Sequence, residues 1–288
     1  MMDFVVLPLI AAMVTMMVGG PLVDRLAPAS AVRWNALLLS AVVAAAVPTF
    51  WMVGLSGLAH LGVRSSVFDW SMHLLPDHPL VSVAIGVSSL TLAVVGTVRV
   101  VGVLRAYAGA RCAETCPFHL VDSPEVFAYT LPGPARTIAV SRGLRDSLDD
   151  REFDIVLAHE RAHADHRHDR YLLLANVATA VLPVVHAAGR RLQFHLERWA
   201  DEIAVGSTGG DRRLAARTIA KVALVQSISP AMLGIASHGV AARAGALITP
   251  PLAPTMTRRV LVGVAVAVTV SLSIGQLHHT AEFALSMI

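Results

Sequence analysis

The sequence predicts a mainly α-helical, multi-pass membrane protein with four transmembrane helices and a small α+β domain inserted between the third and the fourth. Of its 288 residues, 55% are hydrophobic and only 15% are charged, and the mean hydropathy is +0.63. Soluble domains carry about 25% charged residues, so this composition is typical of membrane proteins. Four runs are apolar and long enough to cross a bilayer, at about 4–23, 35–58, 80–98 and 260–277.

The charges and cysteines narrow the possible partners. The net charge of +3 comes from arginines that are spread over loops and mixed with acids, and Lys221 is the only lysine, so we expect no nucleic-acid binding. The N-terminus lacks the basic start of a secretory signal, which favours a retained first span. Cys112 and Cys116 lack the spacing of a redox or zinc-knuckle motif and are expected to be reduced thiols.

Arginines between the apolar runs predict an orientation in the plasma membrane. The connection 24–33 and the long stretch 99–259 are rich in arginine, whereas the loop 59–79 holds Arg64 against two aspartates. The tail after residue 277 has no lysine or arginine. By the positive-inside rule, the N-terminus and the tail lie outside, and 24–33 and 99–259 lie in the cytoplasm.

These assignments divide the chain into three predicted parts. Residues 1–104 form a three-span membrane region, 105–256 form a cytoplasmic domain, and 257–288 form the last transmembrane helix with a short extracellular tail. A fifth apolar run, 171–188, is long enough for one crossing.

The predicted cytoplasmic domain begins with short strands and continues with helices. Segments 118–121, 126–130 and 137–140 are β-prone, and Leu131-Pro132-Gly133-Pro134 is a turn signal. The next helix has two overlapping start signals, Ser147 before Asp150 and Asp149 before Glu152. Amphipathic helices are expected later, at 212–226 and 236–248.

This helix carries the pattern His-Glu-x-x-His at residues 159–163. Histidines four residues apart lie on one helical face, so His159 and His163 can reach one zinc ion. Glu197, 34 residues after His163, is expected to be the third ligand, with water in the fourth position. Glu160 would be the catalytic base that takes the proton of this activated water. Asp201, one turn after Glu197, would accept the outer N–H of a ligand histidine.

Nearby histidines offer alternatives. His166 lies on the same predicted face and is the main rival for third ligand, but one helix cannot easily place three side chains around a tetrahedral ion. His168, Arg167 and Arg170 are expected to form a solvated basic face near lipid headgroups. The remaining histidines, including His195, are expected to be ordinary polar side chains. The candidates for stabilising a tetrahedral oxyanion are Arg213, Arg217 and Tyr171.

The zinc motif constrains the fifth apolar run. A single crossing by 171–188 would place His163 and Glu197 on opposite sides of the membrane, and the gap is too short for two crossings of about 20 residues each. We therefore expect 171–188 to pack in the core of the domain or to be re-entrant, with a bend at Pro183.

His159-Glu160-x-x-His163 with Glu197-x-x-Ala200-Asp201-x-x-Ala204 resembles the gluzincin membrane peptidases, which include HtpX and the CaaX prenyl proteases. The short ligand gap, three preceding spans and one following span most resemble the BlaR/MecR-type integral-membrane zinc metallopeptidases. Segments 127–133 and 138–144 also resemble the region before that family's zinc helix. Antibiotic sensors of this type carry an extracellular penicillin-binding domain, which we expect to be lacking because the chain ends eleven residues after Leu277.

The resemblance implies a membrane-embedded metalloendopeptidase with one Zn²⁺ per chain, which cleaves a cytoplasmic, often regulatory, protein or itself. The expected partners are a protein or peptide substrate, the bilayer and a membrane sensor protein. The alternative is a non-catalytic scaffold or signalling partner that retains the peptidase fold, although a scaffold requires no base at Glu160. A transporter is disfavoured, because the spans contain almost no ionisable residues.

Overall fold

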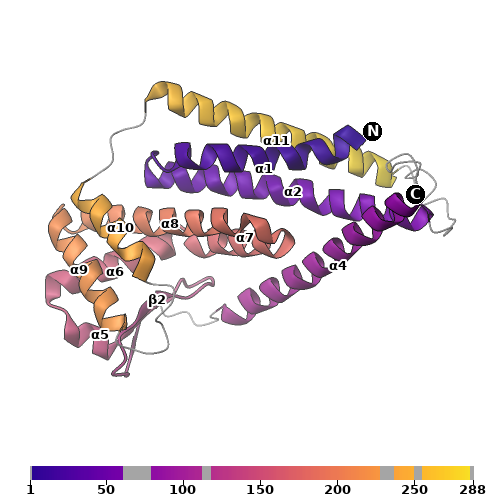
Figure 1. Cartoon of the computed structure of the whole chain (residues 1–288). Coiled ribbons are helices and arrows are strands. Elements are labelled where there is room, and N and C mark those ends of the chain that lie inside the picture. The colour runs from indigo at the N-terminus through magenta and orange to yellow at the C-terminus, as the bar shows by residue number, and fades with distance from the viewer. Residues whose placement is uncertain (1, 61–78, 112–117, 228–236, 250–254, 286–288) are drawn as a thin grey trace.

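The computed structural model describes residues 2–60, 79–111, 118–227, 237–249 and 255–285 (Figure 1). The protein is mainly helical, with one small sheet. The predictions for Cys112, Cys116 and most of the loop 59–79 lie outside the described residues.

Within the described ranges, three helices are long and apolar enough to cross a bilayer, and they match the second, third and fourth predicted spans. These stretches are Pro28–Leu58 in α2 (Pro28–His60), Leu80–Ala110 in α4 (Pro79–Ala110) and Arg259–His278 in α11 (Met256–Leu285). The first predicted span is also helical, as α1 (Met2–Val23). Among the described residues its apolar stretch is Val6–Met17, which is shorter than a full span, so its crossing stays a prediction.

The membrane helices pack through small residues and buried polar contacts. Gly57 of α2 lies against Gly86 of α4, where a Cβ added to Gly57 would meet the Gly86 Cα at 2.4 Å. Any larger residue at this crossing would push the two helices apart, as at small-residue contacts in membrane bundles generally. Gln276 of α11 donates a hydrogen bond of 2.8 Å to Thr49 of α2. Figure 1 shows α1, α2 and α11 running alongside one another.

A three-stranded sheet follows at the predicted positions. β1 (Phe118–Val121), β2 (Ala128–Thr130) and β3 (Ile138–Ser141) have the order β1-β3-β2. β3 pairs in parallel with β1 and antiparallel with β2. All four residues of β3 are buried, which makes it the core strand, and β2 is left at the edge facing α6.

The helix α6 (Asp150–Asp165) begins at one of the two predicted start signals. The Asp149 side chain accepts the Glu152 backbone N–H at 2.9 Å, and the Glu152 carboxylate accepts the Asp149 N–H at 3.1 Å. This reciprocal capping box fixes the start of α6, because it satisfies two backbone donors that have no partner inside the helix. Ser147 instead ends the short helix α5 (Arg142–Ser147).

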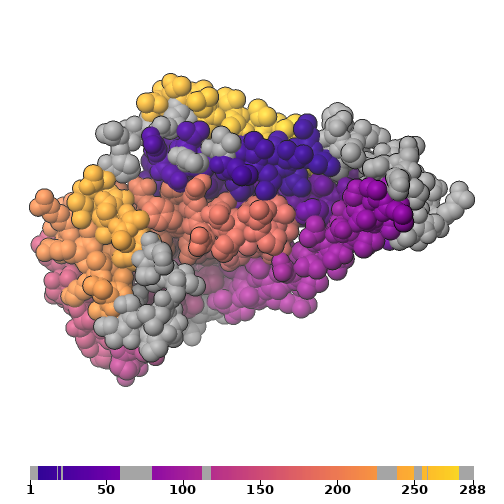
Figure 2. Space-filling model, viewed as in Figure 1, coloured from indigo at the N-terminus to yellow at the C-terminus, as the bar shows by residue number. Residues whose placement is uncertain are grey.

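The fifth apolar run forms a helical hairpin. α7 (His168–Val181) ends in a short 3-10 turn, η2 (Pro183–Val185), and α8 (His186–Ser207) then returns along it. α7 packs on α2 and α4, and α8 packs on α2. Figure 2 shows the hairpin directly below the indigo N-terminal helices. Their shared buried core consists of Ala12, Val32, Leu39, Val42, Ala175, Ala178, Val185, Ala188, Leu192 and Leu196. Two amphipathic helices, α9 (Arg212–Ser227) and α10 (Ser237–Ile248), complete the domain near their predicted ranges.

Candidate metal centre

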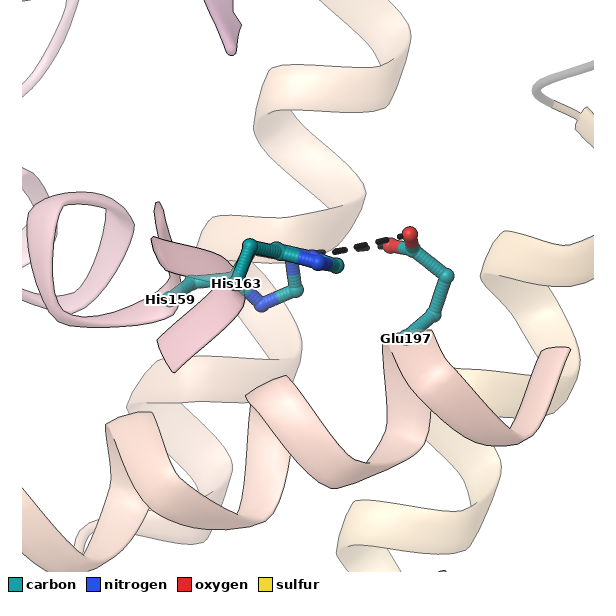
Figure 3. A group of neighbouring side chains, drawn as sticks. All are labelled: His159, His163 and Glu197. Carbon is teal, nitrogen blue, oxygen red and sulfur yellow. Dashed lines mark hydrogen bonds and ion pairs between the residues drawn. The ribbon is translucent and has the colours of Figure 1, made fainter. Parts of the chain in front are cut away.

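Two packed helices, α6 and α8, bring the predicted metal ligands together. His159 and His163 lie one turn apart on α6, and Glu197 faces them from α8 (Figure 3). On α8, Leu192 and Leu196 are fully buried against the membrane helices. This packing fixes the rotation of α8 about its axis, so that Glu197 is presented to α6.

The separations among the candidate ligand atoms are close to those around a tetrahedral zinc ion. The Nε2 atoms of His159 and His163 lie 3.1 Å apart, and they lie 3.5 Å and 3.6 Å from the two Glu197 carboxylate oxygens. With metal–ligand bonds of about 2.0–2.1 Å, neighbouring ligands of a tetrahedral ion are separated by about 3.3 Å. The donor set of two imidazoles and one carboxylate also suits zinc. The cluster could therefore hold a metal ion.

A charged network surrounds His159. Its Nδ1 lies 3.0 Å from Asp201, whose side chain is 1% exposed. Arg243 of α10 donates two hydrogen bonds to the Asp201 carboxylate, at 2.6 Å and 2.8 Å, and lies 2.8 Å from Glu197. Sequence reasoning missed Arg243, because it is 42 residues from Asp201 and nothing in its local pattern marks it.

The network is arranged around a positive charge. Burial disfavours a charged His159, but hydrogen bonds to Asp201 and Glu197 raise its pKa to about 10. Burial likewise opposes a charged Glu197, yet His159 and Arg243 hold the pKa of this carboxyl well below its usual range. Both carboxylates are thus ionised. Glu197 faces Nε2 of His159, where a cation would bind, and Asp201 contacts Nδ1 of the same ring.

The Nδ1 atom of His163 faces a neutral histidine, which corrects one prediction. His168 is only 1% exposed, and its Nδ1 lies 2.9 Å from the Nδ1 of His163, so the prediction of a solvated face at His168 is wrong. Burial, followed by the nearby His163, lowers the pKa of His168 to about 3. The neutral His168 ring packs against Trp199 at a centroid distance of 4.9 Å. Its Nε2 is buried without a hydrogen-bond partner among the described residues.

Neither the rival ligand nor the predicted oxyanion groups join the cluster. His166 caps the end of α6 and packs on Trp199, with ring centroids 4.6 Å apart, outside the group of ligand atoms. Arg213 and Arg217 are exposed on α9. The Tyr171 ring lies 6.5 Å from that of His168. Within the described residues, the arginine that lies at the cluster is Arg243.

Glu160 is held beside the cluster by β2. The Thr130 hydroxyl lies 3.0 Å from a carboxylate oxygen of Glu160 and 2.9 Å from its backbone carbonyl oxygen. Burial raises the pKa of Glu160, and the nearby His159 and the Thr130 hydrogen bond partly offset this effect. A carboxylate with a raised pKa is better matched to proton transfer near neutral pH than an ordinary surface glutamate.

An apolar helical fold with a His-His-Glu cluster able to hold a metal is the combination found in membrane-associated metallopeptidases. The profile of peptidase family M48 matches residues 100–233, which cover the end of α4, the sheet, both ligand helices and α9. This match supports the M48 metallopeptidase family and points to a protease.

A curated protein agrees with this match. A segment of 55 residues is 47% identical to the "Protease HtpX homolog" of Thermoplasma acidophilum (strain ATCC 25905 / DSM 1728 / JCM 9062 / NBRC 15155 / AMRC-C165). The segment covers 19% of this chain and 17% of that relative, so the chain matches only about a sixth of the relative's length. No solved structure matches significantly.

Proposed function

We propose that the chain is a membrane-embedded zinc endopeptidase that cleaves peptide bonds of a cytoplasmic protein. The observation that carries the proposal is the set of separations of 3.1–3.6 Å among the two histidine Nε2 atoms and the two Glu197 carboxylate oxygens, with Glu160 alongside. The M48 match supports the same reading. In this proposal His159, His163 and Glu197 hold one Zn²⁺, and Asp201 fixes the tautomer of His159.

The catalytic steps fall to residues of this chain. When bound, zinc would supply Lewis-acid activation of water and of the scissile carbonyl. Glu160 accepts the proton of the attacking water and passes it to the leaving amine. Thr130 holds the Glu160 carboxylate in place, and Asp201 accepts the outer N–H of His159 so that Nε2 stays free to bind metal. Arg243 keeps Asp201 and Glu197 ionised.

The proposed orientation has the zinc site in the cytoplasm and the N-terminus outside. Asp24, in the arginine-bearing connection after α1, pairs with His195 of α8 at 2.9 Å, which supports placing this connection and the peptidase helices on the same side. The hairpin of α7 and α8 shares a core with Val42, nine residues after Arg33. Nine helical residues span about 14 Å, roughly half of the hydrocarbon core, so we propose a re-entrant hairpin.

Within the wider family, the arrangement of spans and the short gap between the ligands favour a BlaR/MecR-like peptidase. The substrate in that case is a cytoplasmic protein, a repressor or the chain itself. The activating signal would arrive through the membrane helices or a partner protein.

The deciding test compares the wild-type protein with Glu160→Gln after purification in detergent and loading with zinc. Glu160→Gln keeps the side-chain shape and removes the base, so zinc stays stoichiometric while peptide cleavage falls by at least about a hundredfold. Elemental analysis and a quenched-fluorescence peptide assay measure the two effects. Proteomic comparison of cells that carry the two forms would identify the substrate.

Two results separate this proposal from the alternative of a non-catalytic scaffold. Glu197→Ala should remove the zinc, and Asp146→Asn, an exposed control outside the cluster, should leave zinc and cleavage unchanged. Cleavage by Glu160→Gln at the wild-type rate would sink the mechanism, and stoichiometric zinc in Glu197→Ala would sink the ligand assignment.

A further inference from the structure

A cavity of about 260 Å³ opens beside the candidate metal centre, where the end of α4, the β2–β3 turn and the start of α7 meet. Its wall includes Ala164, which follows the ligand His163, and Thr130, whose hydroxyl lies 3.0 Å from the Glu160 carboxylate. Thr130 therefore both lines the cavity and contacts the candidate catalytic base.

The lining of this cavity is strongly positive. Four arginines face a single aspartate, Asp169, and they come from three separate segments: Arg111 after α4, Arg136 in the β2–β3 turn, and Arg167 and Arg170 at the start of α7. Asp169 is already engaged, because its carboxylate accepts a hydrogen bond of 2.6 Å from the Tyr107 hydroxyl. We call the four arginines the arginine subsite.

Most of this positive charge is uncompensated. Within the part of the chain that the structure describes, the guanidinium groups of Arg111, Arg167 and Arg170 have no acidic partner within ion-pair distance. Arg136 lies 3.8 Å from Asp165, at the outer limit of an ion pair, and the Asp165 side chain is 73% exposed. The subsite therefore presents guanidinium donors without matching acceptors, which favours an anionic ligand.

Two of these arginines have an uncommon backbone conformation. Arg136 and Arg167 have φ angles of 52° and 53°, in the left-handed region that residues other than glycine seldom adopt. No other described non-glycine residue has a positive φ. Strain of this kind persists where the surrounding structure fixes it, and it concentrates at binding sites.

We propose that the arginine subsite binds an acidic side chain of the peptide substrate. This inference rests on the proposed peptidase function and names its substrate class: peptides with Asp or Glu close to the scissile bond. An extended peptide advances about 3.3 Å per residue, so a cavity that shares Thr130 with Glu160 is reached within two or three residues of the cleaved bond. The volume is smaller than the roughly 300–1,000 Å³ of small-molecule pockets and suits a single side chain.

The test uses a set of quenched peptides that differ only by Glu or Gln at one position, scanned over three residues on each side of the scissile bond. The wild type should prefer Glu at one position by about tenfold in kcat/KM, the effect of a charge-assisted hydrogen bond at a half-exposed site. In Arg167→Gln/Arg170→Gln this preference should vanish, so that the Glu and Gln peptides are cleaved with equal kcat/KM. The control Arg151→Gln/Arg190→Gln removes two exposed arginines elsewhere and should keep the preference.

A binding measurement separates failure of the subsite from failure of the peptidase proposal. Fluorescence anisotropy with zinc-loaded Glu160→Gln should show tighter binding of the Glu peptide than of the Gln peptide, even if the protein cleaves neither. Equal binding and equal cleavage of both peptides at every position would overturn the subsite. It would also be overturned if the double variant lost binding to vesicles containing phosphatidylglycerol and kept the preference for Glu.

Discussion

The two histidines of the candidate metal centre are supported in opposite ways. His159 contacts Asp201, which Arg243 holds by two hydrogen bonds, so its support is charged and its members satisfy one another. His163 contacts the buried neutral ring of His168, which packs on Trp199 and has an unpartnered Nε2 among the described residues. A charged network keeps its geometry only while all members are present, whereas an imidazole packed against aromatic rings can lose one contact and stay in place. The His159 side is therefore expected to be the more sensitive to substitution.

Asp201→Asn, on the His159 side, should reduce stability and zinc affinity more than the substitutions of His168 on the His163 side. It removes the carboxylate that faces His159 and leaves the buried guanidinium of Arg243 with Glu197 alone. Removing one member of a buried ion pair costs about 3–5 kcal/mol of stability, and loss of an outer partner weakens metal binding about 10–100-fold. Thermal unfolding and competition with a zinc chelator measure the two quantities. An unfolding temperature and zinc affinity equal to those of Asp146→Asn would show that the network is dispensable.

On the other side, His168→Phe and His168→Gln separate packing from hydrogen bonding. Phe keeps the ring and deletes the acceptor for the outer N–H of His163, so zinc affinity should fall about tenfold. Gln offers a carbonyl acceptor and should weaken zinc binding less than Phe does. The reverse order would mean that ring packing on Trp199, rather than the hydrogen bond, supports His163.

Thr130→Val should have the smallest effect of these substitutions, because it leaves the contacts of His159 and His163 unchanged. It deletes the hydroxyl that holds Glu160, so cleavage should slow about fivefold, the equivalent of a hydrogen bond worth about 1 kcal/mol, while zinc affinity is unchanged. Tyr129→Phe is the matched control, since it removes an exposed hydroxyl from the neighbouring position of β2. A loss of zinc in Thr130→Val would place this residue in the metal site and contradict its assigned role.

The sequence predicted the parts of the site that depend on local spacing. The i, i+4 histidines, the capping box at Asp149 and the three short strands all follow from patterns within a few residues. Arg243 could not be predicted, because its contact with Asp201 depends on how α10 folds back onto α8.

The burial of His168 was missed for a related reason. The predicted solvated face with His168 requires one continuous helix. However, α6 ends at Asp165, and Arg167 takes a left-handed conformation before α7 begins. The chain reverses there and turns His168 inward against His163. The three apolar helices that are long enough to span a bilayer were predictable from hydropathy. The continuation of α4 to Ala110 was not, because the arginines in this part of the helix end the apolar run.

The contact between Asp24 and α8 links the candidate metal centre to α1. His195 is fully buried and pairs with Asp24, and Arg191 lies directly on Gly20 of α1. Glu197 follows His195 by two residues on α8. Rotation of α1, or its displacement along its axis, would therefore break the Asp24–His195 and Arg191–Gly20 contacts or move α8 together with α1. A displacement of α1 that carried α8 with it would therefore change the distance between Glu197 and the two histidines.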